Sequence, residues 1–147
     1  METLRVLPDW AGAYQPAIVA ATLLCLLVLA QTGLGVVFGI VMGREEPGGK
    51  YRGDYSEFGF RTLRTYINST ETLAVFAFSL LLAILAGADP GWVNWLAALY
   101  VAARGLHWVF YYAGAGPNVG GPRTMAFVTG WIINILLAAV ALLALLG

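Results

Sequence analysis

Four apolar stretches, each long enough to cross a lipid bilayer, make up most of this 147-residue chain. A helix that spans a bilayer needs about 20 predominantly apolar residues. Four segments meet that length: roughly residues 17–42, 59–86, 92–113 and 122–146. The chain is 60% hydrophobic and only 11% charged, whereas soluble domains carry about 25% charged residues. The sequence therefore predicts an all-α integral membrane protein, with residues 1–147 forming one domain that folds as a bundle of four transmembrane helices.

The distribution of lysine and arginine predicts how this bundle is oriented. Four spans place both termini on one side of the membrane and loops one and three on the other. The cations near those two loops are Arg44, Lys50, Arg52, Arg61, Arg64, Arg104 and Arg123, against Arg5 alone near the termini. Because short cytoplasmic loops carry the excess of Lys and Arg, loops one and three are expected in the cytoplasm. Both termini are expected outside, in a periplasm or lumen.

Charge and cysteine content exclude several function classes. The formal net charge is zero, so nothing indicates a nucleic-acid partner. Cys25 is the only cysteine and His107 the only histidine, so neither an internal disulfide nor a zinc or haem site is expected. The apolar composition leads us to expect contact with membrane lipid.

The second apolar stretch carries polar and charged residues on one face. Arg61, Arg64, Asn68 and Glu71 follow at spacings of three, four and three. At about 100° per residue they fall within an arc of roughly 80°. They indicate either an internal lattice of salt bridges or a polar ligand site. Burying several charges for structure alone stabilises little, so the pattern favours a ligand that carries carboxylates, which arginine binds with two parallel hydrogen bonds, and an amine.

The third stretch repeats the pattern. Tyr100, Arg104, His107 and Tyr111 are spaced by four, three and four along one helical face and approach the same membrane level. Arg123 opens the fourth stretch, where it is either part of this site or an arginine that anchors the helix at the interface. Before the second stretch, Asp54 and Glu57 have the spacing of a capping box that starts a helix.

Three motifs in this order resemble a known family. They are Arg64-x-x-x-Asn68-x-x-Glu71, Ala103-Arg104-x-x-His107-x-x-x-Tyr111 and Pro122-Arg123-Thr124. Together they are similar to the signatures of the MAPEG family, the membrane-associated proteins of eicosanoid and glutathione metabolism. Histidine at position 107 is similar to the prostaglandin E synthase branch, and loop three is longer and richer in glycine than in well-known members.

The resemblance implies a homotrimer that binds glutathione between protomers near the cytoplasmic face. It implies that Arg64, Asn68 and Glu71 hold glutathione, with Arg61 on the same face, and that Arg104, His107 and Tyr111 complete the pocket. Arg44 resembles loosely an arginine that reaches the ligand, and Arg123 corresponds to the arginine that activates the thiol. The implied activity is a detoxifying glutathione transferase or peroxidase that acts on lipophilic electrophiles or lipid hydroperoxides from the bilayer.

Two other function classes are compatible with a small helical membrane protein. One is a non-catalytic lipid-binding or scaffold protein of the same fold, against which the glutathione-type residues argue. The other is a small multidrug transporter. Such transporters place a carboxylate in the first span, and the stretch at 17–42 contains none.

Overall fold

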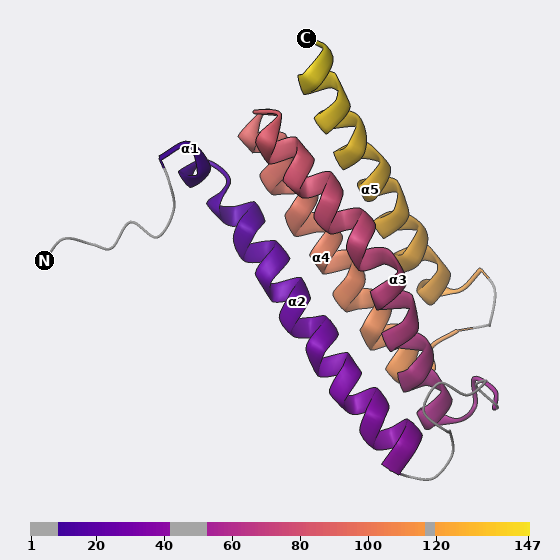
Figure 1. The fold of residues 1–147 in the computed structure, drawn as a ribbon. Helices are drawn as coiled ribbons and strands as arrows, with labels where there is room; N and C mark the ends of the chain where they lie inside the picture. The colour runs from indigo at the N-terminus through magenta and orange to yellow at the C-terminus, as the bar shows by residue number, and fades with distance from the viewer. Residues whose placement is uncertain (1–8, 42–52, 117–119) are drawn as a thin grey trace, which may run out of the picture.

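The computed structural model describes residues 9–41, 53–116 and 120–147, and within them every regular element is helical (Figure 1). The elements are α1 (Asp9–Gly12), α2 (Gln15–Gly35), a π-helical segment η1 (Val36–Val41), α3 (Phe58–Leu85), α4 (Pro90–Tyr112) and α5 (Pro122–Leu146). The four long helices run side by side and alternate in direction, and α4 packs most extensively against α5 (Figure 1). The expected all-α fold is confirmed.

The outer surface of the four packed helices is largely apolar, as a lipid environment requires. Three helical segments in the described residues are long and apolar enough to cross a membrane: Gln15–Phe38, Phe58–Leu85 and Pro122–Leu146. Large apolar side chains point outward along them, among them Leu26, Phe78 and Leu143. A soluble protein rarely exposes so continuous an apolar surface, so the chain is an integral membrane protein. The fourth long helix, α4, is not among these three segments, and its sequence includes Asn94, Arg104 and His107.

Proline and glycine set the helix ends. Pro90 and Pro122 occupy the first helical position of α4 and α5, where the missing N–H is not needed. The Asp89 carboxylate caps α4 by accepting a hydrogen bond from the Trp92 amide at 3.0 Å. Gly114 follows α4 with φ +62°, which lets the Ala115 amide donate to the Phe110 carbonyl at 3.0 Å. This left-handed residue closes the last turn and directs the chain back across the end of the bundle.

The start of α3 differs from the expected capping box. Its N-cap residue is Glu57, which makes no capping hydrogen bond with its side chain, and the helix begins at Phe58. The Asp54 carboxylate instead accepts from the Ser56 amide at 2.7 Å and from the Ser56 hydroxyl. Asp54 is therefore not the N-cap of α3, because its carboxylate closes a local turn that ends before the helix starts.

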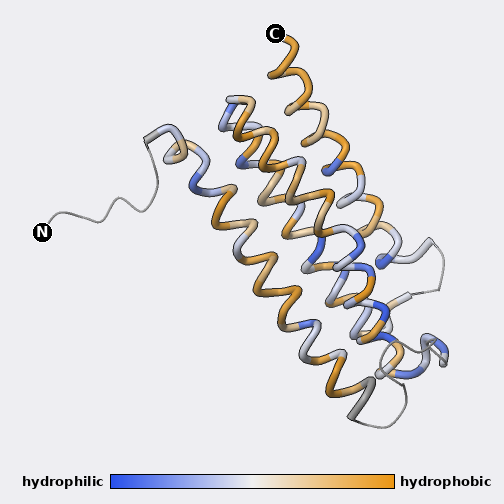
Figure 2. Tube along the Cα trace, in the orientation of Figure 1, coloured by the Kyte–Doolittle hydropathy of each residue, from blue (hydrophilic) through white to orange (hydrophobic). Residues whose placement is uncertain are grey.

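The interior is divided into an apolar half and a polar half. At the apolar centre, the Phe76 and Tyr100 rings stack with centroids 4.2 Å apart and planes 8° from parallel. Buried alanines such as Ala17, Ala83 and Ala97 let the helices approach closely. Hydrophilic positions gather on α3, α4 and the start of α5, in the half that faces the loop before α3 and the α4–α5 loop (Figure 2). The candidate site lies in that half.

Candidate functional site

Arg104 on α4 joins that helix to α3 inside the polar half. Its Nη2 atom donates to Asn68 Oδ1 at 2.8 Å and to Ser69 Oγ at 3.1 Å. Only 2% of the Arg104 surface is exposed. A hydrogen bond that involves a charged group contributes about 1.5–3 kcal/mol, and a buried guanidinium depends on such partners. The structure thus brings together Asn68 and Arg104, which the sequence assigned to one site.

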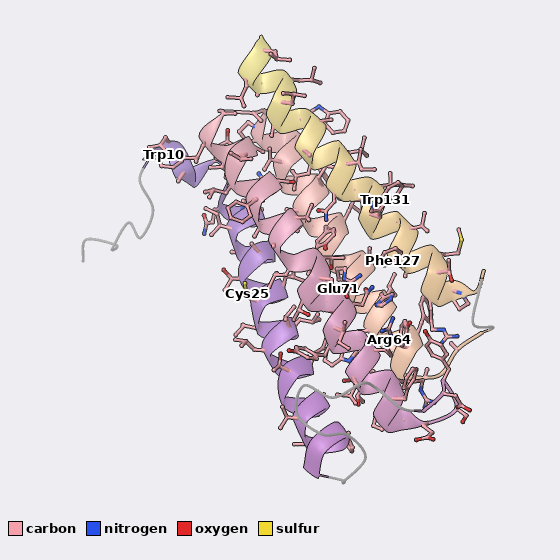
Figure 3. The ribbon with its side chains drawn as sticks, turned by 45° about the vertical axis from the view of Figure 1, so that its right-hand side comes forward. Trp10, Cys25, Arg64, Glu71, Phe127 and Trp131 are labelled. Atoms are coloured by element: carbon pink, nitrogen blue, oxygen red, sulfur yellow. The ribbon has the colours of Figure 1, made fainter. Side chains whose placement is uncertain are left out.

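The other members of the α3 face divide between interior and surface. Arg64 and Glu71 both lie on α3, and Glu71 is farther than Arg64 from the start of the helix (Figure 3). Arg64 is half-buried and Glu71 is exposed. Among the residues that the structure describes, Glu71 makes no hydrogen bond or ion pair. A carboxylate on an outer face that is mostly apolar is costly in lipid.

The Arg61 side chain bonds to backbone carbonyls rather than to the other members of this face. Its Nη1 atom donates to the backbone carbonyls of Tyr55 at 2.7 Å and Ser56 at 2.8 Å. Its Nη2 atom donates to the Tyr112 carbonyl at 3.5 Å. The Arg61 side chain therefore ties the turn before α3 to the end of α4, and the structure does not place it with Arg64 and Asn68.

Arg123 lies at the first turn of α5, where only 5% of its surface is exposed. Its Cζ atom is 4.8 Å from the ring centroid of Tyr55 and 5.1 Å from that of Tyr111. Its Nη2 atom donates to the Gly116 carbonyl at 3.5 Å. A guanidinium within about 6 Å of an aromatic ring is attracted to the face of that ring. Arg123 is thus held between α4 and the turn before α3.

His107 and Tyr111 continue the inward face of α4. Their ring centroids are 4.8 Å apart, and the Phe127 ring of α5 lies 6.3 Å from His107. His107 is buried and Tyr111 half-buried. Arg104, His107 and Tyr111 follow one another on this face. The row begins at Arg104, which bonds to Asn68, and ends at Tyr111, whose ring contacts Arg123. Arg44, also assigned to the site from sequence, lies outside the described residues.

A polar cavity of about 340 Å³ opens beside Arg123. Its lining residues are Asp54, Tyr55, Ser56, Gly114, Gly116 and Arg123. Hydrogen bonds from the Ser56 side chain and from the Ser56 and Glu57 amides hold the pKa of Asp54 below its ordinary value of 3.8. Asp54 is therefore a carboxylate at neutral pH, and it gives the cavity a negative group as well as the Arg123 cation.

Sequence reasoning did not identify Tyr55 or Ser69 as part of the site. Ser69 lies next to Asn68 on α3, and its signal is only a small polar residue within a charged helix. Tyr55 precedes the helix, and helical periodicity gives no information on residues in a turn. No group of three or more His, Cys, Asp or Glu side chains in the described residues is arranged to hold a metal ion.

The model of the MAPEG family matches residues 15–143 of the chain, which include α2, α3, α4 and all but the last three residues of α5. No curated protein sequence matches the chain.

Proposed function

Since the chain belongs to the MAPEG family, a family of membrane proteins of glutathione and eicosanoid metabolism, we propose that it is a glutathione-dependent transferase or peroxidase. The observation that carries the proposal is the position of Arg123. Its guanidinium is almost completely buried, yet it borders a polar cavity at the same end of the bundle as Arg104 and Asn68. A positive charge held in this way suits an anion that forms from a bound thiol.

The proposed binding set matches the chemistry of glutathione, a tripeptide with two carboxylates, an amine and a thiol. Arg64 and Arg104 supply cations for carboxylates, and the Arg104 Nε atom has no hydrogen-bond partner among the described residues. The Asn68 amide donates and accepts, and exposed Glu71 is suited to an ammonium group. His107 and Tyr111 border the path from this set to Arg123. Arg61 is left out because its Nη1 atom already donates to the backbone carbonyls of Tyr55 and Ser56.

Arg123 supplies the charge that the reaction needs. A free thiol is mostly protonated at neutral pH, whereas its thiolate is the nucleophile. A guanidinium nearby favours the thiolate by direct attraction, which water screens little at a buried position. The same thiolate attacks a lipophilic electrophile or reduces a lipid hydroperoxide, so both reactions use one site. The second substrate enters from the bilayer that surrounds α2, α3 and α5.

We expect all four long helices to span the membrane, with the loops next to Arg123 in the cytoplasm and both termini outside. The basis for including α4 is its length of 23 residues, which at 1.5 Å per residue exceeds the hydrocarbon thickness of about 30 Å. Asn94 accepts from the Ala17 amide of α2, Arg104 donates to Asn68 of α3 and His107 is buried, so these polar residues face the other helices rather than lipid.

The proposed active form is a homotrimer. Glu71 is exposed on an apolar outer face, and a second copy of the chain would cover it and bring it into the site. Native mass spectrometry in a mild detergent is expected to give the mass of three chains. Spectra that contain only monomers or dimers, from protein that still binds glutathione, would contradict the trimer.

The α3 face gives the direct test of binding. We expect Arg64→Ala and Glu71→Ala each to weaken glutathione binding by about 1–3 kcal/mol, because each removes one charged partner of the ligand. Isothermal titration calorimetry in detergent measures the change. Thr70→Ala is the matched control, since Thr70 is exposed beside Glu71 and its hydroxyl bonds only to carbonyls of its own helix. Unchanged affinity in both variants, with helical content intact, would end the assignment of this face to glutathione.

A further inference from the structure

Tyr55 contacts Arg123, although it lies before α3 and outside every motif that pointed to the site. Its ring centroid is 4.8 Å from Arg123 Cζ, closer than the ring of Tyr111 on α4 at 5.1 Å. We propose that Tyr55 is a positioning residue that fixes the direction of the Arg123 guanidinium beside the polar cavity. The proposal rests on the proposed function, in which Arg123 stabilises a thiolate.

Tyr55 itself is held firmly by the turn that contains it. The Arg61 guanidinium bonds to the Tyr55 carbonyl at 2.7 Å and to the next carbonyl, that of Ser56, at 2.8 Å. The Phe60 ring meets the Tyr55 ring edge to face, with centroids 5.3 Å apart and planes at 88°. The hydrogen bonds of Ser56 to the Asp54 carboxylate close the turn. Backbone and ring of Tyr55 are thus held by Arg61 and Phe60, neither of which lines the polar cavity.

Arg123 needs such a contact because of its own flexibility. An arginine side chain has several rotatable bonds, and ordering it costs up to about 2 kcal/mol. The Nη2 atom of Arg123 donates to the Gly116 carbonyl at 3.5 Å. The Tyr55 and Tyr111 rings lie 5.9 Å apart, and their hydroxyl oxygens are 3.4 Å apart. Two neighbouring aromatic rings, one from α4 and one from the turn before α3, therefore contribute to the position of the guanidinium.

The direction of this guanidinium matters for catalysis more than for binding. A charge stabilises a developing anion only when it is already aimed at the position of that anion. If Tyr55 is lost, Arg123 keeps its charge but samples more orientations. The expected defect is therefore in the thiolate population and the turnover number, whereas the affinity for glutathione, which depends on α3 and α4, changes little.

Three variants test this role: Tyr55→Leu, Tyr55→Phe and, as a control, Tyr66→Leu. Phenylalanine keeps the ring face and loses only the hydroxyl, whereas leucine removes the ring. Tyr66 is another half-buried tyrosine, and it packs against Gly35 on α2. For each variant we measure the ultraviolet absorbance of the thiolate on adding glutathione at pH 7, and kcat and KM with an activated aryl halide.

We expect Tyr55→Leu to lose most of the thiolate signal and about tenfold in kcat, the scale of one cation–π contact in a buried site. Its KM for glutathione should stay within about twofold of the wild type, because the binding charges are untouched. Tyr55→Phe should retain both signal and kcat, and Tyr66→Leu should resemble the wild type. If the hydroxyl of Tyr55 were the group that matters, Tyr55→Phe would show the same defect as Tyr55→Leu. Normal signal and kcat in Tyr55→Phe therefore assign the effect to the ring.

Two outcomes separate failure of this proposal from failure of the proposed function. A wild type without any thiolate signal would overturn both. A normal wild type with an equally strong signal and equal kcat in Tyr55→Leu would overturn only the role of Tyr55. If Tyr55→Leu does not fold, Tyr55→Met replaces it, since methionine keeps an apolar side chain against Phe60 but has no ring to face Arg123. A kcat equal to that of the wild type in Tyr55→Met would then overturn the role.

Discussion

Arg123→Leu is expected to lower turnover about 100-fold while glutathione affinity changes by less than about threefold. Removal of one preorganised group that stabilises a developing anion typically costs this much. Without the guanidinium, the pKa of the bound thiol should return toward the free value of about 8.5, so the thiolate absorbance at pH 7 should nearly vanish. Stopped-flow absorbance and steady-state kinetics with an aryl halide or an organic hydroperoxide measure the two effects.

Arg123→Lys is the matched control. Lysine keeps the positive charge but lacks the planar fork and stacks less well on the Tyr55 and Tyr111 rings. It should therefore retain part of the thiolate signal. If Arg123 serves only as an anchor at the membrane interface, lysine and leucine should both give normal thiolate and normal turnover, and that result would remove Arg123 from the catalytic role.

Asn68→Leu is expected to destabilise the protein without glutathione by about 2–4 kcal/mol. The change removes the 2.8 Å acceptor of a guanidinium that is only 2% exposed, and it leaves the Ser69 hydroxyl as the remaining side-chain acceptor. Arg104→Met should cost less, because it removes the buried charge together with its need for a partner. The measurement is the free energy of unfolding in mixed micelles for each variant.

The double variant Asn68→Leu with Arg104→Met provides the control. If the cost of Asn68→Leu arises from an unpaired buried charge, removing that charge should restore much of the lost stability, and the two changes should be strongly non-additive. Additive losses, or an Asn68→Leu variant as stable as the wild type, would show that the Arg104 contact contributes little to the fold.

The first long helix shows that the length of an apolar stretch predicts a helix but not the type of helix. The apolar stretch at 17–42 indicates one continuous helix, whereas the structure has an α-helix to Gly35 and a π-helical segment from Val36 to Val41. A π-helical segment accommodates wider turns in the same apolar surroundings. Hydropathy therefore cannot distinguish it from an α-helix. By contrast, α4 and α5 begin at prolines, and Gly87 and Gly114, both with positive φ, follow the ends of α3 and α4.

What the sequence by itself determined is the helical, membrane-embedded character of the chain and the faces on which its polar residues lie. Both follow from local properties: apolar length, the helical repeat and the residues that end helices. Arg104 and Asn68, predicted to lie on inward faces of two helices, indeed meet. Such pairs are predictable because a helix fixes the direction in which each side chain leaves it.

Only the tertiary structure decided which groups each long side chain contacts. Arg61 shares a helical face with Arg64, but it binds backbone carbonyls of the preceding turn and of α4. Tyr55 has no periodic pattern around it, yet its ring lies against Arg123. An arginine side chain reaches in several directions from one position, and a turn has no repeat from which its direction can be inferred. The contacts of Arg61 and Tyr55 depend on how the ends of α3, α4 and α5 pack against the turn before α3. That packing is a property of the whole fold.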